Sequence, residues 1–197
     1  MAKKIQREFY RRDDTLQIAQ ELLGKNLVVP TADGERVAGM IVETEAYLGA
    51  IDKAAHSYQN RRTKRTETMF AEGGRAYIFF VYGMYFQFNV VVGKANVPHA
   101  ILIRAVEPVE NIEIMRTRRG IMSDKNLTSG PGKLCIAFAI DKTFNDADLL
   151  GDKVWLEDFK TFSDDEILSG KRIGIDYAEE FAEKSWRFWV KDNLFVS

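Results

Sequence analysis

The sequence predicts one domain of mixed α-helix and β-strand. Its 197 residues can bury one substantial core, and no internal repeat or Pro/Gly-rich linker divides them. Helical periodicity at 13–24 is followed by period-two alternation at 37–48. The apolar run 76–92 then predicts a β-hairpin. We therefore expect a single domain over residues 1–197.

The first elements have recognisable boundaries. Asp13, Asp14 and Thr15 each offer an N-cap for the first helix, and Gly24 ends it. A short strand is expected at 26–30. The turn at 33–34 then leads into the long strand 37–48.

This long strand has two different faces. The mostly apolar face suits the core and carries Ala38, Met40, Val42, Ala46 and Leu48. The other face carries Glu43, Glu45 and Tyr47. Carboxylates within an apolar strand are costly to bury without partners. We therefore expect the second face to leave the core and enter a cleft.

Two later elements also place unusual side chains. The tip of the hairpin, 82–84, bears Tyr82 and Met84 where small turn residues are usual. The buried-type strand 100–106 contains Arg104, which requires an anionic partner. Two helices and an aromatic strand complete the expected elements, at 109–119, 132–140 and 185–190.

Composition restricts the class of protein. The single cysteine, Cys135, allows no intrachain disulfide and fits a reducing compartment. With only two histidines beside it, a His/Cys structural zinc site is not expected. No apolar run approaches the roughly 20 residues of a membrane helix, and the basic N-terminus leads into no signal core. We expect a cytoplasmic protein, in the bacterial nucleoid or a eukaryotic nucleus, that is neither secreted nor membrane-bound.

Charge is distributed unevenly along the chain. The net charge is −1, but residues 1–135 carry +5 and residues 136–197 carry −6. The basic residues cluster at 61–65 and at 116–119. Such clusters fit either solvated loops or a nucleic-acid face. The second interpretation requires catalytic residues beside them.

Several common chemistries lack their motifs here. We find no phosphate-binding P-loop, no dinucleotide fingerprint and no zinc-deaminase pattern. The turn 129–133 is better explained as a helix cap than as an anion site. The remaining carboxylate, tyrosine, histidine and arginine suit metal-free hydrolysis by an activated water. Aromatic side chains around them would suit a flat ligand.

Four blocks of the chain resemble the alkyladenine (3-methyladenine) DNA glycosylase family. They are Ile41-Val42-Glu43-Thr44-Glu45-Ala46-Tyr47-Leu48-Gly49 with Asp52 and Ala54-Ala55-His56-Ser57, Tyr82-Gly83-Met84-Tyr85-Phe86 with Asn89, Leu102-Ile103-Arg104-Ala105-Val106-Glu107-Pro108, and Ser129-Gly130-Pro131-Gly132-Lys133-Leu134-Cys135. Their order matches, and the resemblance extends from about residue 9 to about residue 190.

The resemblance implies a fold and a function. The fold would be α+β: a single domain with a curved, mainly antiparallel sheet, surrounding helices and a protruding β-hairpin. The protein would be a monofunctional, monomeric DNA glycosylase of base excision repair, without metal or other cofactor. Its partner would be double-stranded DNA containing an alkylated or deaminated purine, which it flips out and hydrolyses.

The resemblance also implies the catalytic groups. Glu45 would be the general base for the attacking water, and Arg104 would hold the carboxylate and that water. Glu43 would support them from behind. The alternative is that Glu45 and Arg104 form a structural ion pair, and both roles can hold together.

Other residues would hold the base. Tyr47 would stack on it, and Phe79 would form the other wall, where the family has a tyrosine. His56 would contact the sugar-phosphate or the base edge. Asn89 would discriminate exocyclic groups, unless it is a structural asparagine. Losing the hydroxyl at Phe79 preserves stacking but leaves the substrate range open.

The hairpin tip would contact the duplex. Tyr82 would wedge into it, flanked by Met84, unless the ring folds back on its own sheet. Two rival functions remain. A damage-binding or RNA-binding module would need no buried base, and a hydrolase of free nucleosides would need neither wedge nor basic clusters.

Overall fold

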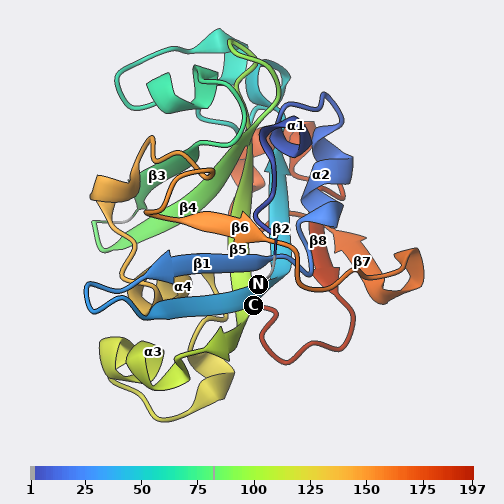
Figure 1. Ribbon diagram of the computed structural model, residues 1–197. Coiled ribbons are helices and arrows are strands. Elements are labelled where there is room, and N and C mark those ends of the chain that lie inside the picture. Colours follow the sequence, from blue (N-terminus) through green and yellow to red (C-terminus); the bar gives the residue numbers. More distant parts are fainter. Residues whose placement is uncertain (1–2, 82) are drawn as a thin grey trace.

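The computed structural model describes residues 3–81 and 83–197 of the chain (Figure 1). The helices are α1 (Arg7–Tyr10), α2 (Thr15–Glu21), α3 (Ile112–Arg119) and α4 (Pro131–Ala137). The strands are β1 (Asn26–Pro30), β2 (Arg36–Tyr47), β3 (Ala76–Val81), β4 (Tyr85–Val92), β5 (His99–Glu110), β6 (Trp155–Glu157), β7 (Ile167–Gly170) and β8 (Arg187–Val190). Short 3-10 helices lie between them.

The strands form one antiparallel, eight-stranded sheet. Its main order is β3-β4-β5-β2-β1-β6, and β8 pairs with both β2 and β7. The long strand β2 pairs with β5 along one edge. Its other edge pairs with β1 near the start and with β8 at 43–45. This confirms the expected α+β class and the curved, mainly antiparallel sheet.

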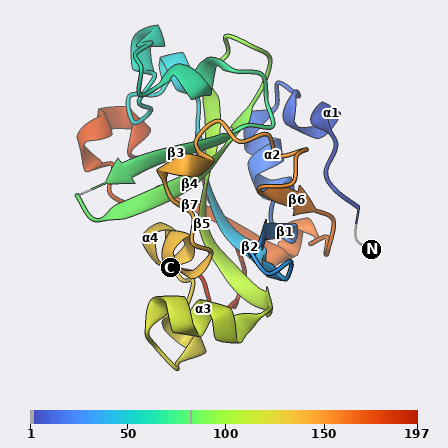
Figure 2. The same ribbon diagram turned by 60° about the vertical axis from the view of Figure 1, so that its left-hand side comes forward.

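The β3–β4 hairpin extends away from α1 and α2, as two views agree (Figures 1 and 2). Register shifts between Ile41 and Thr44 interrupt the pairing of β2 with β5. A bulge of this kind bends a strand and redirects its side chains. It lies immediately before Glu45, so β2 bends where its face changes from apolar to ionisable.

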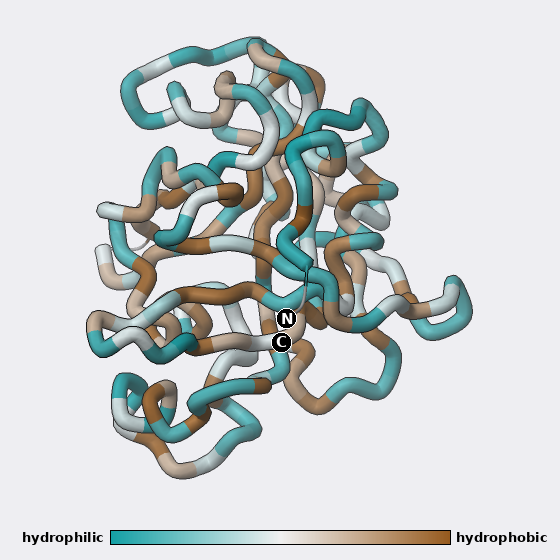
Figure 3. Tube along the Cα trace, in the orientation of Figure 1, coloured by the Kyte–Doolittle hydropathy of each residue, from teal (hydrophilic) through white to brown (hydrophobic). Residues whose placement is uncertain are grey.

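The core lies between the sheet and the helices that cover it. Hydrophobic segments concentrate along the central strands, whereas the peripheral loops are hydrophilic (Figure 3). Fully buried members of the main cluster include Ile41, Val42, Ile101, Ile103 and Phe138. Cys135 is buried in the same cluster. No helix in 3–81 or 83–197 combines the length and apolar character needed to cross a bilayer.

A tight turn after β2 directs the chain toward the hairpin. Gly49 has φ of +53°, and a Cβ there would lie 2.6 Å from the carbonyl oxygen of Pro98. Only glycine accepts both the left-handed conformation and this approach. This turn lies in segment 48–56, which connects the end of β2 to the pocket residues Ala54, Ala55 and His56.

Some expected boundaries were wrong. The helix expected at 109–119 begins only at Ile112, because β5 continues to Glu110 and Asn111 adopts a left-handed conformation. The second helix starts at Pro131 and ends at Ala137, three residues before the predicted end. Gly130 and Pro131 form its N-terminus, which confirms the helix cap.

Candidate functional site

A pocket of about 390 Å³ opens between the centre of the sheet and the hairpin. This volume is within the range of roughly 300–1,000 Å³ typical of small-molecule sites. Four strands supply its walls in pairs: Glu45 and Tyr47 from β2, Tyr77 and Phe79 from β3, Gln87 and Asn89 from β4, and Leu102 and Arg104 from β5. Segment 54–56, Arg65, Met69, residues 173–175 and Tyr177 also line it, as do Phe80, Val81 and Ala100 from the same strands.

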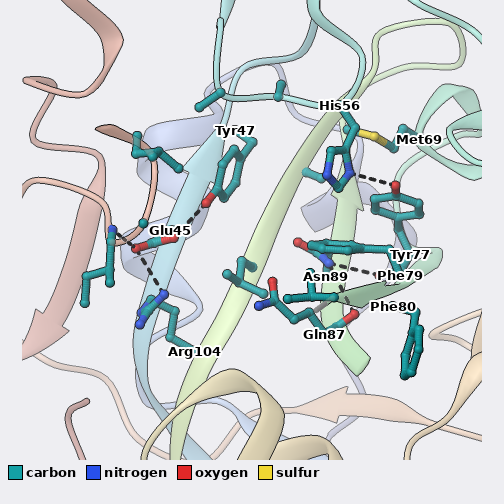
Figure 4. A pocket seen from close by; sticks show the side chains of 18 of the residues that line it. Glu45, Tyr47, His56, Met69, Tyr77, Phe79, Phe80, Gln87, Asn89 and Arg104 are labelled. Carbon is teal, nitrogen blue, oxygen red and sulfur yellow. Dashed lines mark hydrogen bonds and ion pairs between the residues drawn. The ribbon is translucent and has the colours of Figure 1, made fainter. Parts of the chain in front are cut away.

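Glu45 borders this pocket, and its carboxylate is fully buried. Oε1 accepts a hydrogen bond from the backbone N–H of Ile173 at 2.7 Å and lies 3.3 Å from Nη1 of Arg104. Oε2 accepts a hydrogen bond from the Tyr47 hydroxyl at 2.8 Å (Figure 4). Three donors therefore fix the orientation of this carboxylate.

Arg104 also contacts the second carboxylate of β2. Its Nε donates to Oε1 of Glu43 at 3.1 Å, so one guanidinium bridges both glutamates. Arg187 donates to the same Glu43 oxygen at 3.2 Å. Ser197 donates to the other oxygen through its backbone N–H and its hydroxyl. Glu43 thus helps to fix Arg104 against Glu45.

Burial dominates the titration of this cluster. Desolvation raises the pKa of Glu45 above its ordinary value of 4.5, although Arg104, the Ile173 N–H and the Tyr47 hydroxyl oppose the shift. Burial also raises the pKa of Tyr47 well above 10, with the Glu45 charge adding to the rise. Tyr47 is therefore a protonated donor at neutral pH.

The hairpin supplies the opposite wall through two cross-strand pairs. Tyr77 lies opposite Asn89 and Phe79 lies opposite Gln87, so all four side chains share one face. Asn89 Nδ2 donates to the carbonyl oxygens of Tyr77 at 3.1 Å and Gln87 at 3.4 Å. Because Nδ2 is used in these contacts, Oδ1 is the atom of the Asn89 amide that can accept a hydrogen bond from a ligand.

His56 lies against this wall. Its Nδ1 is 3.0 Å from the Tyr77 hydroxyl, and its ring meets Phe79 edge-on at a centroid distance of 4.5 Å. Burial, and then the nearby Arg65 charge, lower the pKa of His56 to about 4. The imidazole is therefore neutral at neutral pH. Figure 4 shows Tyr47 on one side of the pocket and His56 with Phe79 on the other.

The hairpin tip is only partly described. Tyr82 lies outside the described residues, so its expected place as a wedge stays a prediction. Met84 is 66% exposed, and Phe80, on the adjoining strand β3, is 50% exposed. The tip therefore presents apolar side chains to solvent.

The two basic clusters differ. Arg61 and Lys64 are exposed, and Arg65 reaches the pocket rim, where its Nη2 is 3.4 Å from Nε2 of His56. In the second cluster, Arg116 pairs with Asp124 at 2.8 Å, and Arg119 donates to the carbonyl of Leu127. The second cluster therefore holds the α3–α4 connection, whereas the first adjoins the pocket.

Sequence reasoning missed three contributors to this site. Tyr77 could have been found, because alternation places it on the same face as Phe79. Ile173 acts through its backbone N–H, which carries no side-chain signal. Arg172 precedes it and is fully buried behind Tyr47.

His99 begins β5, where it lies opposite Val92. The three tryptophans, Trp155, Trp186 and Trp189, are half-buried. Trp186 packs against the main hydrophobic core. Within 3–81 and 83–197, no three His, Cys, Asp or Glu side chains group as metal ligands.

Comparison with known proteins identifies relatives over nearly the whole chain. The sequence profile described as methylpurine-DNA glycosylase (MPG) matches residues 8–194. The chain is 50% identical to a Clostridium novyi (strain NT) protein, over 99% of this chain and 98% of that protein. It is 50% identical to a protein of Alkaliphilus oremlandii (strain OhILAs) and 46% identical to one of Natranaerobius thermophilus, over 98% of each chain in both cases.

All three relatives carry the name "Putative 3-methyladenine DNA glycosylase". The profile match and the identity cover the residues from Glu45 to Tyr177 that line the pocket. The chain belongs to the methylpurine-DNA glycosylase family.

Proposed function

We propose that this protein is a monofunctional glycosylase that turns an alkylated or deaminated purine out of duplex DNA and hydrolyses its N-glycosidic bond. Family membership supports a DNA glycosylase with hydrolase activity, and the relatives are named for 3-methyladenine. One observation carries the water mechanism. The buried Glu45 carboxylate is fixed by Arg104, Tyr47 and Ile173 beside a pocket walled by aromatic rings.

The pocket would hold the extruded base between Tyr47 and Phe79. Stacking on an aromatic ring contributes roughly 1–3 kcal/mol per base, which offsets much of the unstacking cost. Positively charged alkylpurines gain further from the electron-rich rings. His56 would contact the base edge or the sugar-phosphate, and Asn89 Oδ1 would accept from an N–H of the base.

Hydrolysis would use a water held at Glu45. The ionised carboxylate accepts a proton from this water as the water oxygen bonds to C1′ of the deoxyribose. The electron pair of the C1′–N bond leaves with the purine, and a cationic alkylpurine departs neutral. The carboxylate also stabilises the positive charge that develops on the sugar. Arg104 would orient both the Glu45 carboxylate and the attacking water.

The hairpin would replace the extruded nucleotide. Tyr82 would fill the space in the duplex with Met84 beside it, and the exposed cluster 61–65 would approach the phosphates. One copy of the chain contains all of these groups, so we propose that it acts as a monomer on double-stranded DNA.

The direct test incubates the protein with methylated duplex DNA and follows the release of free purine. Release by wild type and its loss in Glu45→Gln would support the proposal. Binding of damaged DNA without release would instead indicate a damage-binding module. Cleavage of free nucleosides without action on duplex DNA would indicate a nucleoside hydrolase.

The water mechanism makes a second prediction. Between Arg36 and His56 the sequence contains one lysine, Lys53. It pairs with Glu179 and Glu180 and is not among the residues that line the pocket. We expect no Schiff base, and therefore no strand nicking. A covalent adduct trapped by borohydride would contradict hydrolysis by water.

The rate should depend on pH through Glu45. Only the ionised carboxylate accepts a proton, and burial raises its pKa above 4.5. We therefore expect single-turnover excision to fall as the pH drops through this raised pKa. Burial and the nearby Arg65 charge lower the pKa of His56 to about 4, so this imidazole also titrates at acid pH. A His56→Gln variant that kept the same acid midpoint would assign the titration to Glu45, whereas a lost midpoint would assign it to His56.

The Phe79 ring should act by stacking. Phe79→Leu removes the aromatic face, so we expect roughly 1–3 kcal/mol weaker binding of DNA that contains a damaged base. Phe79→Tyr keeps the face and should bind alkylated DNA within about threefold of wild type. Fluorescence anisotropy with damaged and undamaged duplexes measures both. Equal binding by the leucine and tyrosine variants would remove Phe79 from the base sandwich.

A further inference from the structure

We propose that Asp52 and Arg172 form a positioning pair that holds Tyr47 and the Ile173 amide against Glu45. The inference rests on the proposed function and adds two residues that touch neither base nor water. Both side chains are fully buried and lie outside the pocket lining.

The pair has a defined geometry. Arg172 Nη1 is 2.5 Å from Oδ2 of Asp52, and Nη2 is 2.9 Å from Oδ1. This two-point contact fixes the plane of the guanidinium as well as its position. Nη2 also donates to the carbonyl of Phe181 at 3.3 Å. The guanidinium therefore has little freedom to move.

Arg172 contacts β2 between the two functional side chains. Nη1 donates to the carbonyl of Ala46 at 2.9 Å, and Ala46 lies between Glu45 and Tyr47 in sequence. The guanidinium carbon lies 4.6 Å from the centroid of the Tyr47 ring. Because Tyr47 lines the pocket and Arg172 does not, the cation supports the ring from behind.

The residue after Arg172 reaches Glu45 directly. The N–H of Ile173 donates to Oε1 at 2.7 Å, although Ile173 belongs to no helix or strand. Strand β7 has already ended at Gly170, so sheet pairing does not fix this amide. Instead, the amide is held in place by the neighbouring residue Arg172, whose buried side chain is fixed by Asp52 and by the carbonyl of Ala46.

Asp52 connects the same pair to the turn after β2. Oδ2 accepts from the backbone N–H of Leu48 at 3.1 Å, and Oδ1 accepts from that of Ala54 at 3.0 Å. Ala54 lines the pocket two residues before His56. One ion pair therefore ties together the carboxylate, the stacking ring and the turn that leads to the imidazole.

Stability alone explains this arrangement poorly. A buried ion pair is often no more stabilising than apolar side chains of the same volume, because desolvation offsets the attraction. Its directional contacts do fix the groups around it. Displacing a catalytic group by about 1 Å can slow a reaction about 100-fold. Positioning is therefore the effect that the geometry favours.

The test compares Arg172→Lys, Arg172→Met and Asp52→Asn with wild type on methylated duplex DNA. Arg172→Lys keeps the charge but loses the two-point contact. We expect each folded variant to excise purine about 10- to 100-fold more slowly under single turnover. Lys171→Met is the matched control, since Lys171 is exposed and pairs with Glu183 at the surface.

The pH profile separates positioning from a general loss of structure. The Ile173 hydrogen bond lowers the pKa of Glu45, so weakening it should move the acid midpoint of the rate upward by at least about 0.5 pH unit. A purely structural defect would lower the rate equally at all pH values. Far-UV circular dichroism and thermal melting show which variants are folded.

Slower excision together with a higher acid midpoint of the rate, in any folded variant, would support the positioning role of Asp52 and Arg172. Wild-type rates, an unchanged midpoint, or unfolding of all three variants would overturn it. If wild type itself released no purine, the proposed function would fail instead. Wild-type release with unaffected variants would reject only the positioning role.

Discussion

The Glu45→Gln variant should release damaged purine about 10² to 10⁴ times more slowly than wild type, the usual effect of losing a general base. Glutamine has nearly the same shape and can still accept the Ile173 N–H, but it cannot take a proton from water. We therefore expect binding of damaged DNA to persist. Single-turnover release of purine, with binding measured separately, checks both parts.

Glu110→Gln is the matched control for this substitution. Glu110 lies at the end of β5, pairs with Arg36 and does not line the pocket. Its variant should excise at the wild-type rate. Wild-type turnover by Glu45→Gln would exclude Glu45 as the base, whereas loss of turnover in both variants would indicate general damage to the sheet.

The Arg104→Met variant should be about 3–5 kcal/mol less stable than wild type at neutral pH. Glu43 and Glu45 are both fully buried, and Arg104 bridges them. Removing the cation leaves buried negative charge without its partner, which is among the most destabilising substitutions. Urea unfolding followed by circular dichroism gives the free energy of unfolding.

The deficit should shrink as the pH falls. Glu45 has a folded pKa above its unfolded value, and Arg104 is the main group that opposes this rise. Its loss raises the folded pKa further, so the variant gains stability by binding a proton below that pKa. Arg62→Met removes exposed contacts with Glu67 and Asn96 and a guanidinium contact with the Phe70 ring, and it should unfold near the wild-type midpoint. A deficit independent of pH would contradict this account.

Sequence patterns predicted the part of the site that depends on local periodicity. Alternation in β2 placed Glu45 and Tyr47 on one face, and the apolar arms predicted the β3–β4 hairpin. An arginine in a buried-type strand predicted an anionic partner, and Arg104 has two such partners, Glu43 and Glu45. These inferences succeeded because a strand's side-chain period is fixed by its backbone.

The remaining contributors depend on contacts between distant segments. Arg172 pairs with Asp52 across 120 residues, and nothing near either residue indicates the other. The strands β6 and β7 have three and four residues, too few for a periodic signal. The composition of α3 suggested a nucleic-acid patch, but two of its arginines bind groups of this chain: Arg116 pairs with Asp124, and Arg119 donates to the carbonyl of Leu127.

The amide that fixes Glu45 comes from 128 residues later in the chain. During translation, the ribosome therefore delivers the rings of the pocket long before it delivers the donor that completes the carboxylate's surroundings. A polypeptide that stalls between these two points would contain Arg104 and Tyr47 but would lack the Ile173 amide, the third donor to the Glu45 carboxylate. The complete set of donors to Glu45 would therefore exist only after synthesis has passed Ile173.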